Sequence, residues 1–247
     1  MKEFRPKNIK LVIEYDGADF DGWQRNPNMR TVQGEIEKAL SKILNEETQV
    51  KGAGRTDAGV HAKGQVANFT LKKEFDLKKL VYALNGLLPK DAAVVSAKKV
   101  KPDFHSRHSA KLKSYLYIVR NNEIPSPLDR RHSVFYPYKL DIPAMKKGAK
   151  ELCGRHDFRV FSYQDERGHS LRELEAVSIR RFGKYLHIEF RGRSFLRRMV
   201  RIMTGLLLQI GAGRVDPGSV KKILSGKEKY SPLTMPPHGL YLKQIKY

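Results

Sequence analysis

The Gly-rich stretch GAGRTDAGVH, residues 52–61, is the most informative segment of this chain, and a strand-like run that ends at Phe69 follows it. It holds a single carboxylate, Asp57, between Arg55 and His61 and among three glycines. Glycines let a large ligand approach the main chain, and a loop carried by a strand is a common position for catalytic groups. The stretch therefore indicates a functional loop, with a simple Asp57-closed turn as the alternative.

The charge of the chain is strongly one-sided. Its 48 Lys and Arg outweigh 26 Asp and Glu, for a formal net charge of +22 in 247 residues. Such an excess attracts polyanions, either nucleic acid or an anionic membrane surface. No apolar run approaches the ~18 to 20 residues that span a bilayer, so we expect no membrane partner. Since Cys153 is the only cysteine and no export signal is visible, we expect a cytoplasmic protein.

Hydrophobic periodicity predicts alternating strands and helices in the first half of the chain. A polar break around residues 102–108 follows them, and we take it as the boundary between domains 1–106 and 107–247. The expected elements are a strand at 8–15, a helix from Thr31, a strand at 65–71, a helix capped by Asp76 and a strand at 92–100.

The second half repeats this mixture. Its strongest helix is predicted to begin near Ser194, with Arg197, Arg198 and Arg201 opposite an apolar stripe. Those arginines form either a solvated basic face or the lining of a cleft. The other expected elements are a strand at 111–119, a long loop at 121–138, a helix from Asp141, a hairpin of 173–180 with 185–190, a helix after Asp216 and a strand at 239–245.

These elements predict an α+β fold of two similar subdomains, with a mixed, largely antiparallel sheet flanked by helices and a cleft between the subdomains. We find no sequence repeat and no flexible Gly/Ser linker. Subdomain 1–106 carries the Asp57 loop, and subdomain 107–247 carries a strand with Tyr115 and the helix with Arg201.

Four segments together resemble the bacterial tRNA pseudouridine synthase I (TruA) family. Residues 54–61 are similar to its active-site segment, and three further segments agree with the family in chain order. These are residues 15–24 as its first strand and loop, 114–117 as its tyrosine strand and 195–201 as its arginine helix. Each segment alone is a weak signal, but together they span nearly the whole chain.

The resemblance implies conversion of uridine to pseudouridine, with the active site in the basic cleft between the subdomains. Asp57 would be the catalytic nucleophile or base at the junction of sugar and uracil. Tyr115 would stack on the flipped uracil, and Arg201 would pair with Asp57 and keep it ionised. We further expect substrate contacts from Arg55, His61, Arg107, Arg197 and Leu242.

The same resemblance implies the partners. The substrate would be the anticodon arm of tRNA at positions 38 to 40, recognised by shape, and the working unit a homodimer. No phosphate loop of the Gly-x-Gly-x-x-Gly or Walker type is present, so we expect no cofactor. The pair His105-x-x-His108 lacks further ligands at zinc-like spacing, and we expect an RNA-facing loop there and no metal.

Three alternatives remain open. A non-catalytic RNA-binding or ribosome-associated protein would use the same charge, with Asp57 as a turn residue. A nuclease would need clustered carboxylates for metal ions, for which Asp16, Asp19 and Asp21 are the candidates. The same isomerisation could also act on another RNA or another tRNA arm.

Overall fold

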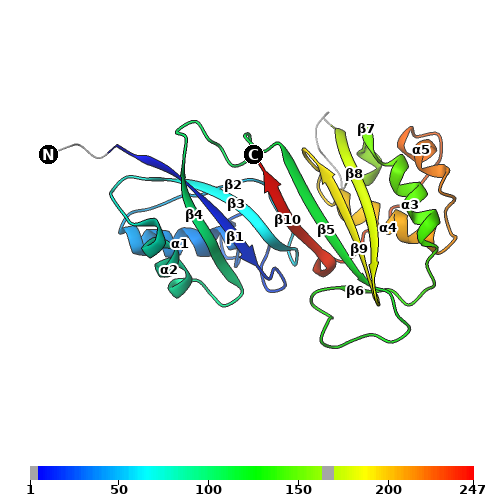
Figure 1. Cartoon of the computed structure of the whole chain (residues 1–247), viewed down its shortest axis with the longest axis horizontal. Helices are drawn as coiled ribbons and strands as arrows, with labels where there is room; N and C mark the ends of the chain where they lie inside the picture. The colour runs from blue at the N-terminus through cyan, green and yellow to red at the C-terminus, as the bar shows by residue number, and fades with distance from the viewer. Residues whose placement is uncertain (1–4, 163–169) are drawn as a thin grey trace. The chain divides into compact units, whose positions relative to one another are not determined.

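The computed structural model describes residues 5–162 and 170–247. They divide into two compact units, whose elements are labelled in Figure 1. The first unit extends to Lys111 and also includes Leu242–Tyr247, and the second is Leu112–Tyr241. The boundary predicted after residue 106 remains a prediction. The return of the last residues to the first unit follows from strand pairing, which chain order does not reveal.

The first unit is built on the strand β1, which lies between two antiparallel neighbours. Leu11 of β1 is opposite Ala67 of β3 and Ala97 of β4. Alternate β1 side chains are buried, including Ile9, Leu11 and Ile13, as the sequence period of two predicts. The strand order is β4 (Ala92–Val100), β1 (Lys7–Tyr15), β3 (His61–Leu71) and β10 (Leu240–Lys246), and the short β2 (Lys51–Gly52) pairs with β3.

Two helices, α1 (Val32–Leu44) and α2 (Leu77–Leu87), belong to the first unit. Each begins at a side-chain cap, because Thr31 accepts from the Gly34 N–H and Asp76 from the Lys79 N–H. The predicted cap at Asp76 is confirmed, and the helix predicted from Thr31 begins at Val32.

The main strands of the second unit pair antiparallel to one another. Ile188 of β9 is opposite Tyr117 of β5 on one side and Ile179 of β8 on the other. The strand order is β5 (Leu112–Arg120), β9 (Tyr185–Gly192), β8 (Leu171–Phe182) and β7 (Gly154–Asp157), with the short β6 (Val134–Phe135) parallel to β5. The predicted hairpin of β8 and β9 is confirmed, and Gly183 at its turn has φ +56°.

The helix α4 (Met199–Gly211) is the buried centre of the second unit, and only Arg201 and Gln209 of its residues are partly exposed. The predicted start near Ser194 is wrong. Arg198 has a left-handed backbone with φ 61° and precedes the first helical residue, Met199, and a left-handed residue cannot continue a right-handed helix. The other helices are α3 (Ile142–Glu151), α5 (Ser219–Leu224) and the 3₁₀ turns η1 (Arg159–Phe161) and η2 (Pro237–Gly239).

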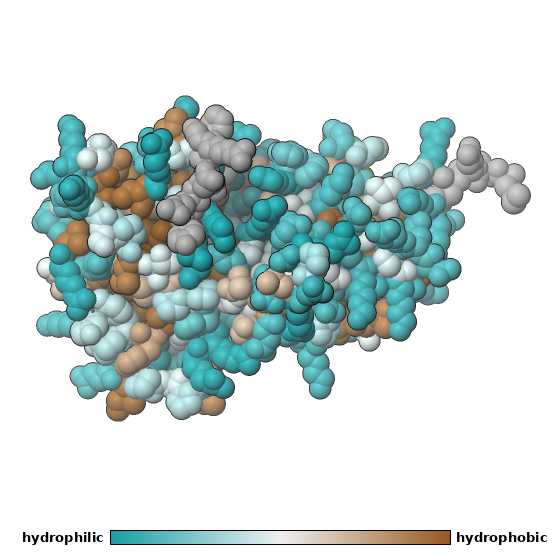
Figure 2. Space-filling view, turned by 180° about the vertical axis from the view of Figure 1, so that it is seen from behind, coloured by the Kyte–Doolittle hydropathy of each residue, from teal (hydrophilic) through white to brown (hydrophobic). Residues whose placement is uncertain are grey.

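Both units therefore combine a largely antiparallel sheet with helices, which confirms the predicted α+β class. Hydrophilic side chains cover much of the face shown in Figure 2, over each unit. None of the helices in the described part of the chain has the length and apolar character needed to cross a bilayer.

Candidate active site

The loop that carries Asp57 joins β2 to β3 and is held along its backbone by the loop that follows β1. The Trp23 N–H donates to the Thr56 carbonyl at 3.2 Å, and the Gly59 N–H donates to the Phe20 carbonyl at 3.2 Å. These two bonds lie on either side of Asp57 in the sequence. The main chain at the candidate catalytic residue is therefore fixed from outside its own loop.

Two glycines of the loop after β1 make this close approach possible. Gly22 has φ +86°, and a Cβ added there would lie 2.5 Å from the Thr56 carbonyl oxygen. A Cβ on Gly17 would meet the Val60 carbonyl, with its carbon 2.5 Å away. Both contacts are to backbone atoms, which cannot rotate away. Larger side chains at either position would push the two loops apart.

Buried side chains of β1 and β3 support the Asp57 loop from beneath. The hydroxyls of Tyr15 and Thr56 are 2.8 Å apart, and Gln65 Nε2 donates to the Gly54 carbonyl at 2.9 Å. Burial raises the pKa of Tyr15 to about 12, and hydrogen bonds to Thr56 and Gln65 oppose that rise. A neutral Tyr15 can therefore hydrogen-bond to Thr56 through the physiological pH range.

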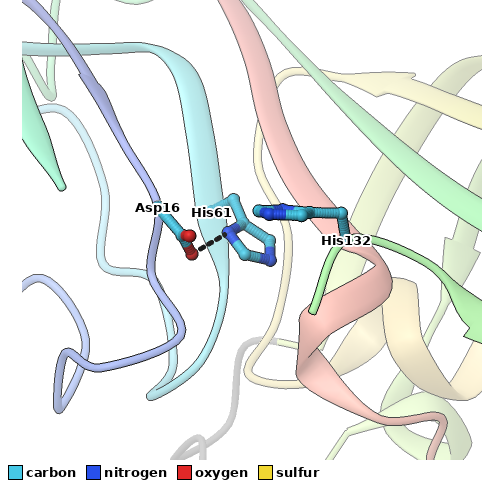
Figure 3. A group of neighbouring side chains, drawn as sticks. All are labelled: Asp16, His61 and His132. Atoms are coloured by element: carbon cyan, nitrogen blue, oxygen red, sulfur yellow. Dashed lines mark ion pairs between the residues drawn. The ribbon is translucent and has the colours of Figure 1, made fainter. Parts of the chain in front are cut away.

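His61 joins the start of β3 to the end of β1. The residue is 1% exposed, and its Nδ1 lies 3.0 Å from both the Gly17 N–H nitrogen and Asp16 Oδ1. Figure 3 shows the carboxylate of Asp16 turned toward this ring. An unprotonated Nδ1 accepts from Gly17, and a protonated Nδ1 donates to Asp16. Both arrangements fix the C-terminal end of the Asp57 loop, a supporting role that the sequence did not indicate.

Asp57 and Arg55 differ in exposure within the same loop. Asp57 is half-buried, and its carbonyl accepts from the Val60 N–H at 3.2 Å in a turn. Arg55 is exposed, and its Nε donates to Gln24 Oε1 at 3.2 Å. The backbone turn at Asp57, which the sequence suggested as an alternative, is therefore present. The positively charged Arg55 lies two residues before Asp57 in the same loop.

Arg107 lies on a loop that buried polar groups fix to the sheet of the first unit. The neighbouring Ser106 is fully buried and its N–H donates to Asn68 Oδ1 at 2.9 Å. The rings of His105 and His108 are 4.4 Å apart. Burial first, then the nearby cationic groups, lowers the pKa of His105. The exposed Arg107 is thereby presented on a rigid segment.

In the second unit, Tyr115 lies on β5 and is 8% exposed. The ring of Phe195 meets it edge to face, with centroids 4.8 Å apart and an interplanar angle of 73°. This geometry is a favourable aromatic pair and restrains the tilt of the Tyr115 ring. The neighbouring Tyr117 is fully buried and donates to the Pro236 carbonyl at 2.6 Å.

Arg201 lies in the first turn of α4, and its Nε donates to the Met235 carbonyl at 2.7 Å. Its charge lowers the pKa of His238, after the larger effect of burial. A guanidinium on an otherwise buried helix is held rigidly, unlike one on a solvated basic face. Arg197, in contrast, is exposed and lies in the turn before α4.

Leu242 is fully buried in β10, within the first unit. The structure therefore places Asp57, Arg55, His61, Arg107 and Leu242 in the first unit and Tyr115, Arg197 and Arg201 in the second.

Comparisons with known proteins agree with one another. The family model for tRNA pseudouridine synthase matches residues 11–109 and 149–247. The chain is 40% identical over 245 residues to tRNA pseudouridine synthase A of Roseiflexus sp. (strain RS-1), covering 98% of this chain and 91% of that protein. It is 41% identical to the tRNA pseudouridine synthase A of Thermoanaerobacter sp. (strain X514), covering 98% of this chain and all of that protein.

Among solved structures, the chain is similar to one titled as an archaeal box H/ACA sRNP Nop10-Cbf5 complex. The TM-score is 0.33 with 16% identity, over 81% of this chain and 43% of that chain. A similarity at this level carries no argument about the site.

Proposed function

The chain belongs to the tRNA pseudouridine synthase family, and on this premise we propose that Asp57 is the catalytic carboxylate with which it converts uridine to pseudouridine in tRNA. In this isomerisation the bond from ribose to N1 of uracil breaks, the base turns, and a bond from ribose to C5 forms. The atoms of the nucleotide are all retained, so the reaction needs no group donor. Identity of about 40% along 98% of the chain is the observation that carries the function.

A carboxylate is suited to this chemistry because it can act as nucleophile or proton acceptor where the glycosidic bond breaks. The backbone bonds at Thr56 and Gly59 support the proposal, since they hold the loop on both sides of Asp57. A group fixed in this way does not have to be ordered when the substrate arrives.

Tyr115 and Arg201 complete the proposed site. A base must leave its stack before it can react, and an aromatic ring then offers a surface for it. We assign that stacking role to Tyr115, with its hydroxyl as acceptor for the C5 proton, and the orientation of Asp57 to Arg201. Two features of the second unit support the assignment: Phe195 restrains the tyrosine ring, and the Met235 carbonyl fixes the guanidinium.

Phosphate contacts would supply most of the affinity for tRNA. The exposed cations Arg55, Arg107 and Arg197 are suited to this role, since guanidinium groups bind phosphate oxygens well. His61 and Leu242 are buried, and their predicted part in substrate binding remains a prediction. We further propose the anticodon arm at positions 38 to 40 as the target, a homodimer as the working unit and the cytoplasm as the compartment.

The test is incubation of the wild type and Asp57→Ala with unmodified tRNA, followed by mapping of pseudouridine at each uridine. We expect wild-type modification in the anticodon arm, and loss of turnover with retained tRNA binding in Asp57→Ala. Asp21→Ala is the matched control, because it removes a nearby exposed carboxylate and should leave turnover unchanged. Full activity of Asp57→Ala would refute the assignment, and modification elsewhere would refute only the target arm.

A further inference from the structure

A chain of three hydrogen bonds connects the helix α1 to the exposed Arg55. Gln33 Nε2 donates to Glu37 Oε1 at 2.9 Å, one helical turn along α1. Gln24 Nε2 donates to Gln33 Oε1 at 2.9 Å, and Arg55 Nε donates to Gln24 Oε1 at 3.2 Å. Side chains from α1, from the loop after β1 and from the Asp57 loop are thus linked in series.

The inner end of this chain is firmly held. Glu37 is 5% exposed. Its Oε1 also accepts from the Val50 N–H at 2.9 Å, and its Oε2 lies 3.2 Å from the Arg25 guanidinium. Gln33 Nε2 donates in addition to the Val50 carbonyl at 3.2 Å, and its Oε1 accepts from the Arg25 N–H at 3.0 Å. The Gln33 amide therefore makes all four bonds of which it is capable.

These bonds have a fixed direction. An ionised carboxylate can only accept, so Glu37 requires Gln33 to turn its NH₂ group inward and its oxygen outward. That oxygen requires the NH₂ group of Gln24, whose own oxygen then faces Arg55. If Gln24 were flipped, its NH₂ group would face the guanidinium, which has no acceptor. A buried charge on α1 thus decides which atom is presented to Arg55.

We propose that Gln24, oriented by Gln33 and Glu37, is a positioning residue that holds Arg55 for binding a phosphate of the tRNA beside Asp57. The inference deepens the proposed function and rests on it. The Gln24 bond occupies the Nε–H of Arg55, and the two terminal nitrogens carry the donors that bind a phosphate in the bidentate manner. Restraining Nε sets the plane of the whole guanidinium, because the group is planar.

The restraint lowers the cost of binding. An exposed arginine samples many rotamers, and ordering such a side chain on its ligand costs conformational entropy. An arginine that is already held at Nε loses less freedom when the phosphate arrives. The effect belongs to tRNA affinity and its salt dependence, rather than to the stability of the fold, since Gln24 and Arg55 are both exposed.

The experiment is a double-mutant cycle of Gln24→Met and Arg55→Ala, read by the Kd for unmodified tRNA over a series of salt concentrations. Methionine keeps the length of Gln24 but lacks the amide oxygen that accepts from Arg55 Nε. We expect Gln24→Met to raise Kd about tenfold and to flatten the slope of log Kd against log salt by up to about one unit. In the Arg55→Ala background, the same change should have no further effect.

Gln49→Met is the matched control, since Gln49 is an exposed glutamine of the same unit outside this chain of bonds, and it should leave Kd unchanged. The proposal would be overturned if Gln24→Met raised Kd equally in the wild type and in the Arg55→Ala background. It would also be overturned if Gln24→Met had the Kd and the salt slope of the wild type. A lowered melting temperature that accounts for the weaker binding would also overturn it. The readout is binding, so a wild type that binds tRNA without forming pseudouridine would refute the proposed function and leave this inference testable.

Discussion

Replacing Tyr15 with phenylalanine removes one hydroxyl from beneath the Asp57 loop and leaves its partner, Thr56, buried without that bond. Loss of one partner of a buried pair costs about 1 to 3 kcal/mol, most of it desolvation of the group left behind. The ring itself stays, so its packing against Trp23, with centroids 6.4 Å apart, is retained. For a chain of this length we expect the melting temperature to fall by ~2 to 4 °C per kcal/mol.

Trp23 is the single tryptophan of the chain and lies in the first unit, so its fluorescence reports the unfolding of that unit. We expect Tyr15→Phe and Thr56→Val each to lower the urea midpoint. The double variant should recover most of the loss, because removal of both partners leaves no unpaired hydroxyl. A double variant that loses the sum of the single effects would refute the reasoning, and so would an unchanged midpoint in Tyr15→Phe.

The same hydroxyl has an alkaline signature. Burial raises the pKa of Tyr15 from 10.0 to about 12 in the folded chain. As the pH rises, Tyr15 ionises in the unfolded chain before it ionises in the folded chain. The stability that protonated Tyr15 contributes to the folded chain is therefore complete below about pH 10 and is lost between about pH 10 and 12. The fall of the unfolding free energy over that range should be smaller in Tyr15→Phe by about 2 to 3 kcal/mol.

Two further predictions concern other parts of the fold. Gly52→Ala should lower the unfolding free energy by about 1 to 3 kcal/mol, because its Cβ would lie 2.5 Å from Cε2 of Trp23. Gly86→Ala on α2 has no neighbour within 4 Å, and it should raise the unfolding free energy by about 0.5 to 1 kcal/mol. Equal urea midpoints of the two variants and the wild type would contradict both predictions. The hydrogen bond from Tyr185 lowers the pKa of Asp129 in the folded chain. Ionised Asp129 therefore stabilises the fold fully above pH 3.8, and this stabilisation is lost as the pH falls through the lowered pKa. Asp129→Asn should lack this acid dependence in urea titrations between about pH 5 and 2, and an identical acid profile would argue against the pair.

Much of the fold was predictable because its signals are local. The side chains of Thr31, Asp76 and Asp141 each accept a backbone N–H at the start of a helix, and capping depends only on neighbouring residues. The alternation along β1 is equally local, since successive side chains of a strand point to opposite faces.

The candidate site was predictable only in part. The sequence singled out Asp57 from its glycines and charged neighbours. The burial of Glu37 was not predictable: this residue of α1 is 5% exposed, and its carboxylate accepts from the Val50 N–H. Helical periodicity cannot anticipate this, because the partner that makes burial of the carboxylate acceptable comes from a different segment. The start of α4 was also predicted wrongly. The apolar pattern begins at Phe195, before the helix, but the left-handed backbone of Arg198 delays the first helical residue to Met199.

The sequence by itself determined the capped helices, the alternating strands, the excess of positive charge and the acidic residue around which the chemistry is proposed. Only the tertiary structure decided which loop holds Asp57, which hydroxyl lies under Thr56 and which amide faces Arg55. Those contacts join residues far apart in the chain, and their hydrogen bonds form only when folding brings the separate segments together.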